Sequence, residues 1–342
     1  MKRTLIILSL SWLTCLPAWS QDPVFSQFYT SSLYLNPALS GFEKDVVFGI
    51  NYRTQWAGVN LPFKTFQFSA IHPIIQQGIK SKHLGAVGAT LFSDEAGPNR
   101  EVISQGFSLA STYNFHLSRK GNHIIATALQ FGVIQRIMNM NALQWSSQYS
   151  SALGYDRSLP GEELIGDRVT SPVINAGAVW RLVADSYFEP MKMYYQGFAV
   201  SNINKPKGFL RDQREISALL YKIHGGYLHT FSNGFEVSPN YLIQHQNSTQ
   251  INVGGYGAYT LPAVTSKNLT DVKVSIGFWY RLRDSFIMTT GLATSSWNLG
   301  FSYDANSSSL ERSFEGANAF EFSFAYKINI IKEMKTFSTP LL

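Results

Sequence analysis

Side chains able to act as catalysts or metal ligands are scattered through this sequence without a recognised spacing. The seven histidines stand singly, without the short intervals that join the ligands of a zinc site. His229 lies near Ser232 and offers a base beside a hydroxyl. His116 and Ser104 form a second, looser pair of the same kind. Nucleophilic catalysis also needs a group that orients the base, and no motif selects one serine. We therefore expect no enzyme, no cofactor and no metal site.

The charged residues give weaker leads. Glu162, Glu163 and Asp167 gather in one segment, where their oxygens offer a calcium site, although a solvated loop is the simpler interpretation. The formal net charge of +6 falls to +4 without the first 20 residues, which hold Lys2, Arg3 and no acidic residue. No block of Lys and Arg is present, so nucleic acid is not an expected partner.

The first 20 residues have the features of a secretory signal peptide. Lys2 and Arg3 make a basic start, residues 5–16 are mostly apolar, and Ala18-Trp19-Ser20 provides small residues at a cleavage site. We predict cleavage after Ser20. The single cysteine, Cys15, leaves with this segment and fits a lipoprotein acylation site poorly, so the mature chain is expected to lack cysteine.

The composition favours a barrel in the outer membrane. A secreted chain without disulfides needs a large core or lipid for its stability. Charged residues make up 15%, aromatic residues 14%, and the mean hydropathy is -0.05, yet no apolar run after the leader approaches the length of a membrane helix. Abundant aromatic residues without long apolar runs are typical of a transmembrane β-barrel, whose strands alternate between lipid and lumen.

Alternation with a period of two supports this interpretation. It is clearest in residues 46–56, 103–117, 273–282 and 318–328, where large apolar or aromatic side chains oppose small or polar ones. In residues 318–328, for example, the even positions carry three Phe, one Tyr and one Ile beyond Asn318. About 14 strands are expected, and the other ten lie at 64–74, 83–93, 123–137, 170–183, 191–202, 221–232, 235–246, 249–260, 285–294 and 296–304.

The predicted strands divide the chain into four parts. We expect a signal peptide at 1–20, a periplasmic strap at 21–44, an antiparallel transmembrane barrel at 45–329 and a periplasmic tail at 330–342. The three longest connections, 138–168, 203–220 and 304–317, all follow odd-numbered strands. They therefore fall on one face, which is the extracellular face if both termini are periplasmic.

The strap and the inward faces supply the candidate site residues. Asn36, Pro37 and Gly41 are expected to shape a turn into the first strand, with or without a partner contact. Periodicity places Arg53 and Arg281 in the lumen. The aromatic residues of the strap are expected to pack into the periplasmic mouth or to meet a partner, with packing preferred; they are Phe25, Phe28, Tyr29 and Tyr34.

A series of short motifs begins in the strap and continues along nearly the whole mature chain. They are Gln21-Asp22-Pro23, Phe28-Tyr29, Asn36-Pro37-Ala38 with Gly41, NYRTQW at 51–56, GFAVSNINKP at 197–206, FWYR at 278–281 and GFSYD at 300–304. In these motifs and in their order, the sequence resembles the PorP/SprF family of type IX secretion system outer-membrane proteins. The departures are Phe301 where Tyr is usual, Ala319-Phe320-Glu321 where a His-Glu pair is common, and a longer tail after Ile328.

The resemblance implies a non-enzymatic component of the outer membrane. Members of the family support secretion or surface attachment of particular cargo, such as gliding adhesins with a type B C-terminal domain, and they link to periplasmic ring or motor components. The alternative is a FadL-like or porin-like transport channel. The small, polar inward faces, with isolated Arg53, Arg281 and Lys327, favour a narrow or filled lumen over a pore.

Overall fold

The computed structural model describes most of the chain after the predicted leader. The described residues are 23–56, 58, 62–76, 82–118, 121–139, 142–151, 154–156, 158–161, 168–186, 189–208, 216–261, 271–308 and 317–330. The predicted signal peptide, the predicted tail beyond residue 330 and the candidate calcium ligands Glu162, Glu163 and Asp167 lie outside this part of the chain.

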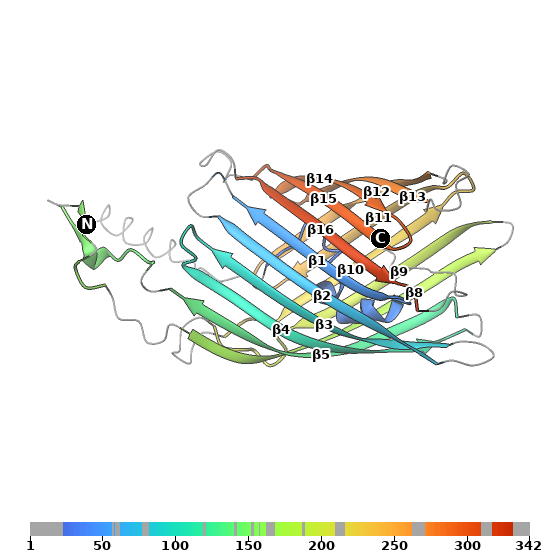
Figure 1. Ribbon diagram of the computed structural model, residues 1–342, viewed down its shortest axis with the longest axis horizontal. Helices are drawn as coiled ribbons and strands as arrows, with labels where there is room; N and C mark the ends of the chain where they lie inside the picture. The colour runs from blue at the N-terminus through green and yellow to red at the C-terminus, as the bar shows by residue number, and fades with distance from the viewer. Residues whose placement is uncertain are drawn as a thin grey trace, which may run out of the picture.

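A closed antiparallel β-barrel forms the body of the protein, as the alternation predicted (Figure 1). Within the described residues fourteen strands make up its wall. Each pairs with its neighbours along the chain, and β1 closes the ring on β16 with Val46 opposite Ile328. The strands are β1 (Val46–Gln55), β2 (Phe63–Gln76), β3 (Lys82–Ala96), β4 (Val102–His116), β5 (His123–Met138), β8 (Arg168–Ser186), β9 (Glu189–Ser201), β10 (Leu220–Thr230), β11 (Phe235–His245), β12 (Thr249–Leu261), β13 (Val272–Arg281), β14 (Ser285–Ala293), β15 (Trp297–Asn306) and β16 (Ala319–Ile328).

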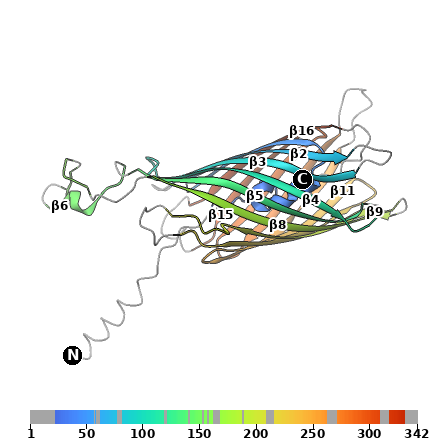
Figure 2. The same cartoon turned by 90° about the horizontal axis from the view of Figure 1, so that it is seen from below.

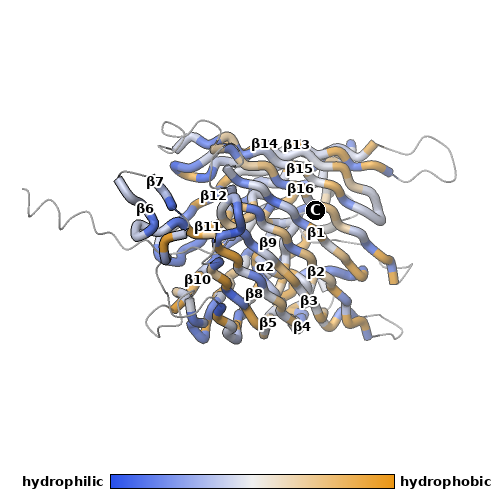
Figure 3. The backbone as a smooth tube through the Cα atoms, turned by 60° about the vertical axis from the view of Figure 1, so that its left-hand side comes forward, coloured by the Kyte–Doolittle hydropathy of each residue, from blue (hydrophilic) through white to orange (hydrophobic). Residues whose placement is uncertain are grey.

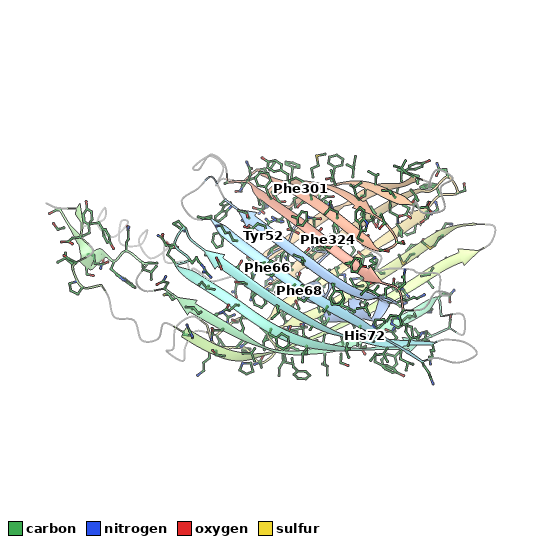
Figure 4. All side chains as sticks on the ribbon, viewed as in Figure 1. Tyr52, Phe66, Phe68, His72, Phe301 and Phe324 are labelled. Carbon is green, nitrogen blue, oxygen red and sulfur yellow. The ribbon has the colours of Figure 1, made fainter. Side chains whose placement is uncertain are left out.

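The outer wall of the barrel is apolar and aromatic. Phe278, Phe286 and Phe131 leave 64%, 60% and 56% of their surfaces uncovered by protein, as residues that face lipid do. Figure 4 places Tyr52, Phe66 and other labelled rings on this wall, and Figure 3 shows hydrophobic and hydrophilic residues interspersed along the strands. Among the described residues, no helix has the length and apolar character needed to cross a membrane.

The two ends of the barrel differ. The connections from β5 to β8, from β9 to β10 and from β15 to β16 leave one end, and the chain enters β1 and leaves β16 at the other. The first of these connections carries a short 3-10 helix η2 (Ser146–Gln148) and a two-stranded sheet of β6 (Tyr149–Ser150) and β7 (Gly154–Tyr155) that stands off the barrel (Figures 1 and 2). We take the end with the long connections as extracellular and the end with both barrel termini as periplasmic, by the rule for bacterial outer-membrane barrels.

Residues 23–45, which we call the plug, fold inside the lumen. They contain the short helix α2 (Ser32–Leu35) and the 3-10 helix η1 (Pro37–Phe42). The sequence placed this segment in the periplasm, but η1 packs against the inner faces of β2, β3, β4, β5 and β8. Its apolar side chains form the core of the molecule, each at most 8% exposed; they are Phe25, Phe28, Tyr29, Leu33, Leu35, Ala38, Leu39 and Phe42.

Small inward residues make room for the plug. Ala126 and Ala128 of β5 lie in the same apolar cluster as the plug residues Leu39 and Phe42. A Cβ atom added at Gly177 of β8 would lie 2.0 Å from Oδ1 of the plug residue Asn36. Because the wall carries small side chains or none at these positions, the segment before β1 fits inside the lumen instead of lying beneath it.

Candidate functional site

The plug runs through the lumen from the extracellular end to the periplasmic end. At its start, Pro23 lines a cavity of about 700 Å³ that we call the vestibule. The vestibule is also lined by residues at or next to the extracellular ends of the strands, among them Phe63, Ala96, Val102, Arg136, Ser201 and Asn247. At the other end of the plug, Asp45 directly precedes Val46, the periplasmic start of β1.

Five buried polar side chains, which we call the clamp, hold the start of the plug to the wall. They are Ser26 of the plug, Arg53 of β1, Arg281 of β13, Asp304 of β15 and Glu321 of β16, and each is at most 3% exposed. The Glu321 carboxylate accepts hydrogen bonds from the backbone N–H groups of Ser26 at 2.7 Å and Gln27 at 3.0 Å. The Ser26 hydroxyl accepts from Arg53 at 2.5 Å and from Arg281 at 2.9 Å, and it donates to Asp304 at 2.5 Å.

The charges of the clamp balance one another. Arg53 pairs with Asp304 at 2.9 Å and with Glu321 at 3.4 Å, and Arg281 reaches Asp304 at 3.3 Å. Two guanidinium groups therefore face two buried carboxylates, and Arg281 also pairs at 3.0 Å with the partly exposed Asp284. Buried ions are tolerated when they are paired and hydrogen-bonded, so each member depends on the others.

The sequence placed Arg53 and Arg281 in the lumen, and the structure brings both into the clamp. Their acidic partners, Asp304 and Glu321, were not selected in advance. A signal was present, because Glu321 lies on the inward face of the last strand and Arg53 on that of the first. Barrel closure pairs these strands, and the two residues are direct register partners.

Asn36 fixes the middle of the plug. Its side-chain oxygen accepts the Ala38 backbone N–H at 3.0 Å and caps η1, whose first residue is Pro37. Its Nδ2 group lies 3.2 Å from the Ala178 carbonyl, 3.1 Å from that of Phe198 and 3.1 Å from His224 Nε2. The turn predicted at Asn36-Pro37 thus joins the plug to β8, β9 and β10.

Gly41 lies where the plug passes close to β4 and β5. A Cβ atom at this position would come within 2.5 Å of Asn114 Oδ1, 2.6 Å of Thr112 Cγ2 and 3.1 Å of the Ala126 Cβ. The Asn114 amide donates to the Gly41 carbonyl at 2.6 Å. Close backbone approach therefore accounts for the glycine.

Aromatic contacts join the plug to β13 and hold its own residues together. Phe28 meets the Trp279 ring edge-on at 5.2 Å between centroids, and Tyr29 stacks on the same ring at 5.8 Å. Phe25 packs edge-on against Tyr34 at 5.5 Å, and the Tyr34 hydroxyl donates to the Pro23 carbonyl at 2.9 Å. The four aromatic residues chosen from the sequence thus contact the barrel or the plug, and Tyr34 also lines the vestibule.

Two ionisable groups lie at the joint between the plug and β1. Burial, together with the nearby Arg181 guanidinium, holds the pKa of the Lys44 ammonium below its ordinary value. Burial, followed by the Glu43 carboxylate, raises the pKa of the Asp45 carboxyl. Both shifts favour the neutral forms, as is expected where charged groups are withdrawn from water.

Of the two histidine and serine pairs considered from the sequence, the structure separates His116 from Ser104. His116 and Ser104 lie twelve residues apart on the single strand β4, a separation of roughly 40 Å. His229 lies 3.1 Å from the Tyr227 hydroxyl and packs against the Phe231 ring. In the part of the chain that the structure describes, no three His, Cys, Asp or Glu residues are grouped to hold a metal ion.

Comparison with known proteins identifies a family. A family model described as "Type IX secretion system membrane protein PorP/SprF" matches residues 19–326. A comparison with curated proteins found no match.

Among solved structures, a Pseudomonas aeruginosa FadL homologue is 12% identical, with 87% of this chain and 94% of that chain covered and a TM-score of 0.44. The CymD monoaromatic hydrocarbon channel is 11% identical, with coverages of 87% and 93% and a TM-score of 0.43. BamA from Haemophilus ducreyi lacking POTRA domains 1-3 is 9% identical, with coverages of 84% and 70% and a TM-score of 0.41.

Proposed function

Because the chain belongs to the PorP/SprF family of type IX secretion system membrane proteins, we propose that it acts without catalysis, as a docking barrel for secreted cargo. The protein is a β-barrel of the outer membrane. Its role on this proposal is to support the secretion or surface attachment of specific proteins, such as gliding adhesins with a type B C-terminal domain.

The filled lumen is the observation that carries this proposal. A diffusion channel needs a continuous aqueous path, whereas here the plug occupies the lumen with eight buried apolar side chains. Burial of each such side chain stabilises the plug in the lumen by about 1.5–3 kcal/mol, and by less for the small Ala38. Movement of the whole plug out of the lumen is therefore unfavourable. Ordering the segment offsets part of that gain. A barrel whose lumen is filled by a segment of its own chain is better suited to bind partners at its surface than to conduct solutes.

The surfaces left for partners lie at the two ends. At the extracellular end, the connection from β9 to β10 lines the vestibule, and the connection with η2, β6 and β7 leaves the same end of the barrel. We assign cargo contact to this end. The short turns of the other end, such as the one between Thr230 and Phe235, face the periplasm, and we assign contact with ring or motor components to them.

Two measurements test the proposal. Deletion of the gene should remove the adhesins from the cell surface, and affinity purification of the intact barrel from detergent-solubilised outer membranes should recover a secreted protein with a type B C-terminal domain. Purification of the unrelated major barrels of the same membrane is the control. If the adhesins stay at the surface and no such protein co-purifies, the docking role is wrong.

Conductance in planar bilayers separates docking from transport. The intact protein should give no large, steady channels, and a variant lacking residues 23–42 should conduct if the lumen is otherwise free. Large channels in the intact protein that are unchanged by the deletion would instead support a FadL-like or porin-like transport function.

A further inference from the structure

Arg181 carries a buried guanidinium group whose N–H donors are largely unused. The residue lies five positions before Ser186, the periplasmic end of β8, and it is 3% exposed. The guanidinium carbon lies 4.2 Å from the centre of the Phe42 ring in the plug. Such a contact uses the face of the guanidinium and not its N–H groups. Nε and Nη1, which carry three of the five N–H groups, have no hydrogen-bond partner.

The two arginines of the clamp show what a buried guanidinium normally has. Arg53 and Arg281 are buried to a similar extent, and each pairs with carboxylates at 3.4 Å or less. At Arg181, the charge of the Glu43 carboxylate acts on the guanidinium and offsets part of its charge. Because a buried charge is costly unless it is paired and hydrogen-bonded, the free N–H groups of Arg181 suit an anionic ligand.

Other basic side chains lie near Arg181 at the periplasmic end, and we call the whole group the basic cluster. Electrostatic interactions link Arg181 with Lys44, His83 and His116, and they link His116 with Lys82. The register explains part of this arrangement, because His116 and Arg181 are both partners of Ile124. Their Cα atoms are therefore two strand spacings apart, about 10 Å. The cluster consists of Lys44 before β1, Lys82 and His83 at the start of β3, His116 at the end of β4, and Arg181.

The basic cluster leads from the periplasmic surface into the lumen. Lys82 is exposed and His116 is half-buried, whereas His83 and Arg181 are buried. His83 Nε2 and His116 Nδ1 are further buried atoms without a hydrogen-bond partner. The acidic residue Asp45 also lies at this end, near Lys44 and Lys327. An approaching anion thus meets basic groups first at the rim and then at increasing depth, as in a site that concentrates anions.

We propose that the basic cluster binds an anionic group, a carboxylate or a phosphate, that enters from the periplasm and contacts the Arg181 guanidinium. Guanidinium N–H groups donate to the oxygens of both groups in paired, charge-assisted hydrogen bonds. The group is either a free phosphate ion or an acidic side chain of a periplasmic protein. The second source rests on the contact with periplasmic components proposed above.

Binding of inorganic phosphate to the purified barrel in detergent tests the site. Equilibrium dialysis with radiolabelled phosphate at constant ionic strength should show saturable binding, and Arg181→Met should weaken it by about tenfold or more. Methionine keeps a long side chain beside Phe42. Lys82→Gln, at the exposed rim, should weaken binding less, and it serves as the test variant if Arg181→Met does not fold. The control is Arg100→Gln, because Arg100 is exposed between β3 and β4 at the opposite end.

A hexaglutamate peptide added as a competitor distinguishes the two sources. Displacement of phosphate by less peptide than unlabelled phosphate indicates an acidic chain as the ligand, and the reverse indicates the free ion. Absence of binding, which would leave Arg181 to water alone, overturns the proposal, as does binding that a folded Arg181→Met retains in full or, if that variant does not fold, that Lys82→Gln retains in full. Heat-modifiable migration in gels verifies folding. Cargo takes no part in this assay, so its failure is distinguishable from failure of the docking role.

Discussion

Replacement of Glu321 by Gln tests whether the clamp holds the plug in place. The carboxylate accepts hydrogen bonds from the Ser26 and Gln27 backbones and from Arg53, whereas an amide offers one oxygen and two N–H donors. At least one backbone donor then faces another donor, and Arg53 loses one of its two carboxylate partners. The change adds no bulk, so a loss of stability reports these bonds.

The expected loss follows from the burial of the site. An unsatisfied buried donor costs about 1–3 kcal/mol, and breaking a buried ion pair by removing one partner costs about 3–5 kcal/mol. Asp304 still neutralises Arg53 in part, at 2.9 Å. We therefore expect Glu321→Gln to lower the free energy of unfolding by about 3–4 kcal/mol, between two and three powers of ten in the equilibrium constant.

Urea unfolding of the purified barrel in detergent micelles, followed by tryptophan fluorescence, measures this difference. The matched control is Glu95→Gln, because Glu95 pairs with Arg100 at 2.7 Å where their side chains remain 24% and 61% exposed. Pairs open to solvent contribute about 1 kcal/mol or less. If the two variants lose the same stability, the clamp does not hold the plug as argued.

Two further substitutions examine the packing of the plug. Phe28→Ala removes a buried ring from its edge-on contact with Trp279 and should lower the free energy of unfolding by about 3–5 kcal/mol in the same assay. The control Phe278→Ala, which changes a lipid-facing ring, should lower it much less. Equal losses would contradict a packed lumen. Gly41→Ala should lower the free energy of unfolding by about 1–3 kcal/mol, because the added Cβ overcrowds the site. The control Gly257→Ala should be close to neutral, because its added Cβ would have no neighbour nearer than 3.5 Å. Unchanged stability of Gly41→Ala would show that the wall moves to make room for the methyl group.

The sequence contains part of the information needed to predict the ion pairs of the clamp. Alternation put Arg53, Arg281 and Glu321 on inward faces, and closure of an antiparallel barrel makes its first and last strands neighbours. What the sequence lacked was register, because a shift of two residues keeps every side chain on its face and changes every partner. Contact between Ser26 and this cluster depends on the path of the plug, which no strand pattern encodes.

The sequence by itself determined the barrel. Each strand must put apolar side chains toward lipid and smaller or polar ones inward, and this local requirement leaves a period of two that can be counted without coordinates. The same alternation, with the lengths of the connections, predicts which end faces outward.

Only the tertiary structure decided what fills the lumen. The space left inside the barrel depends on the inward side chains of every strand together. The sequence of one segment, such as residues 21–44, therefore does not reveal whether that segment lies beneath the barrel or within it. The aromatic residues of the plug looked suited to either place. Wall residues with little or no side chain, such as Gly177 and Ala126, are far from the plug in sequence, and they leave the space that the plug occupies.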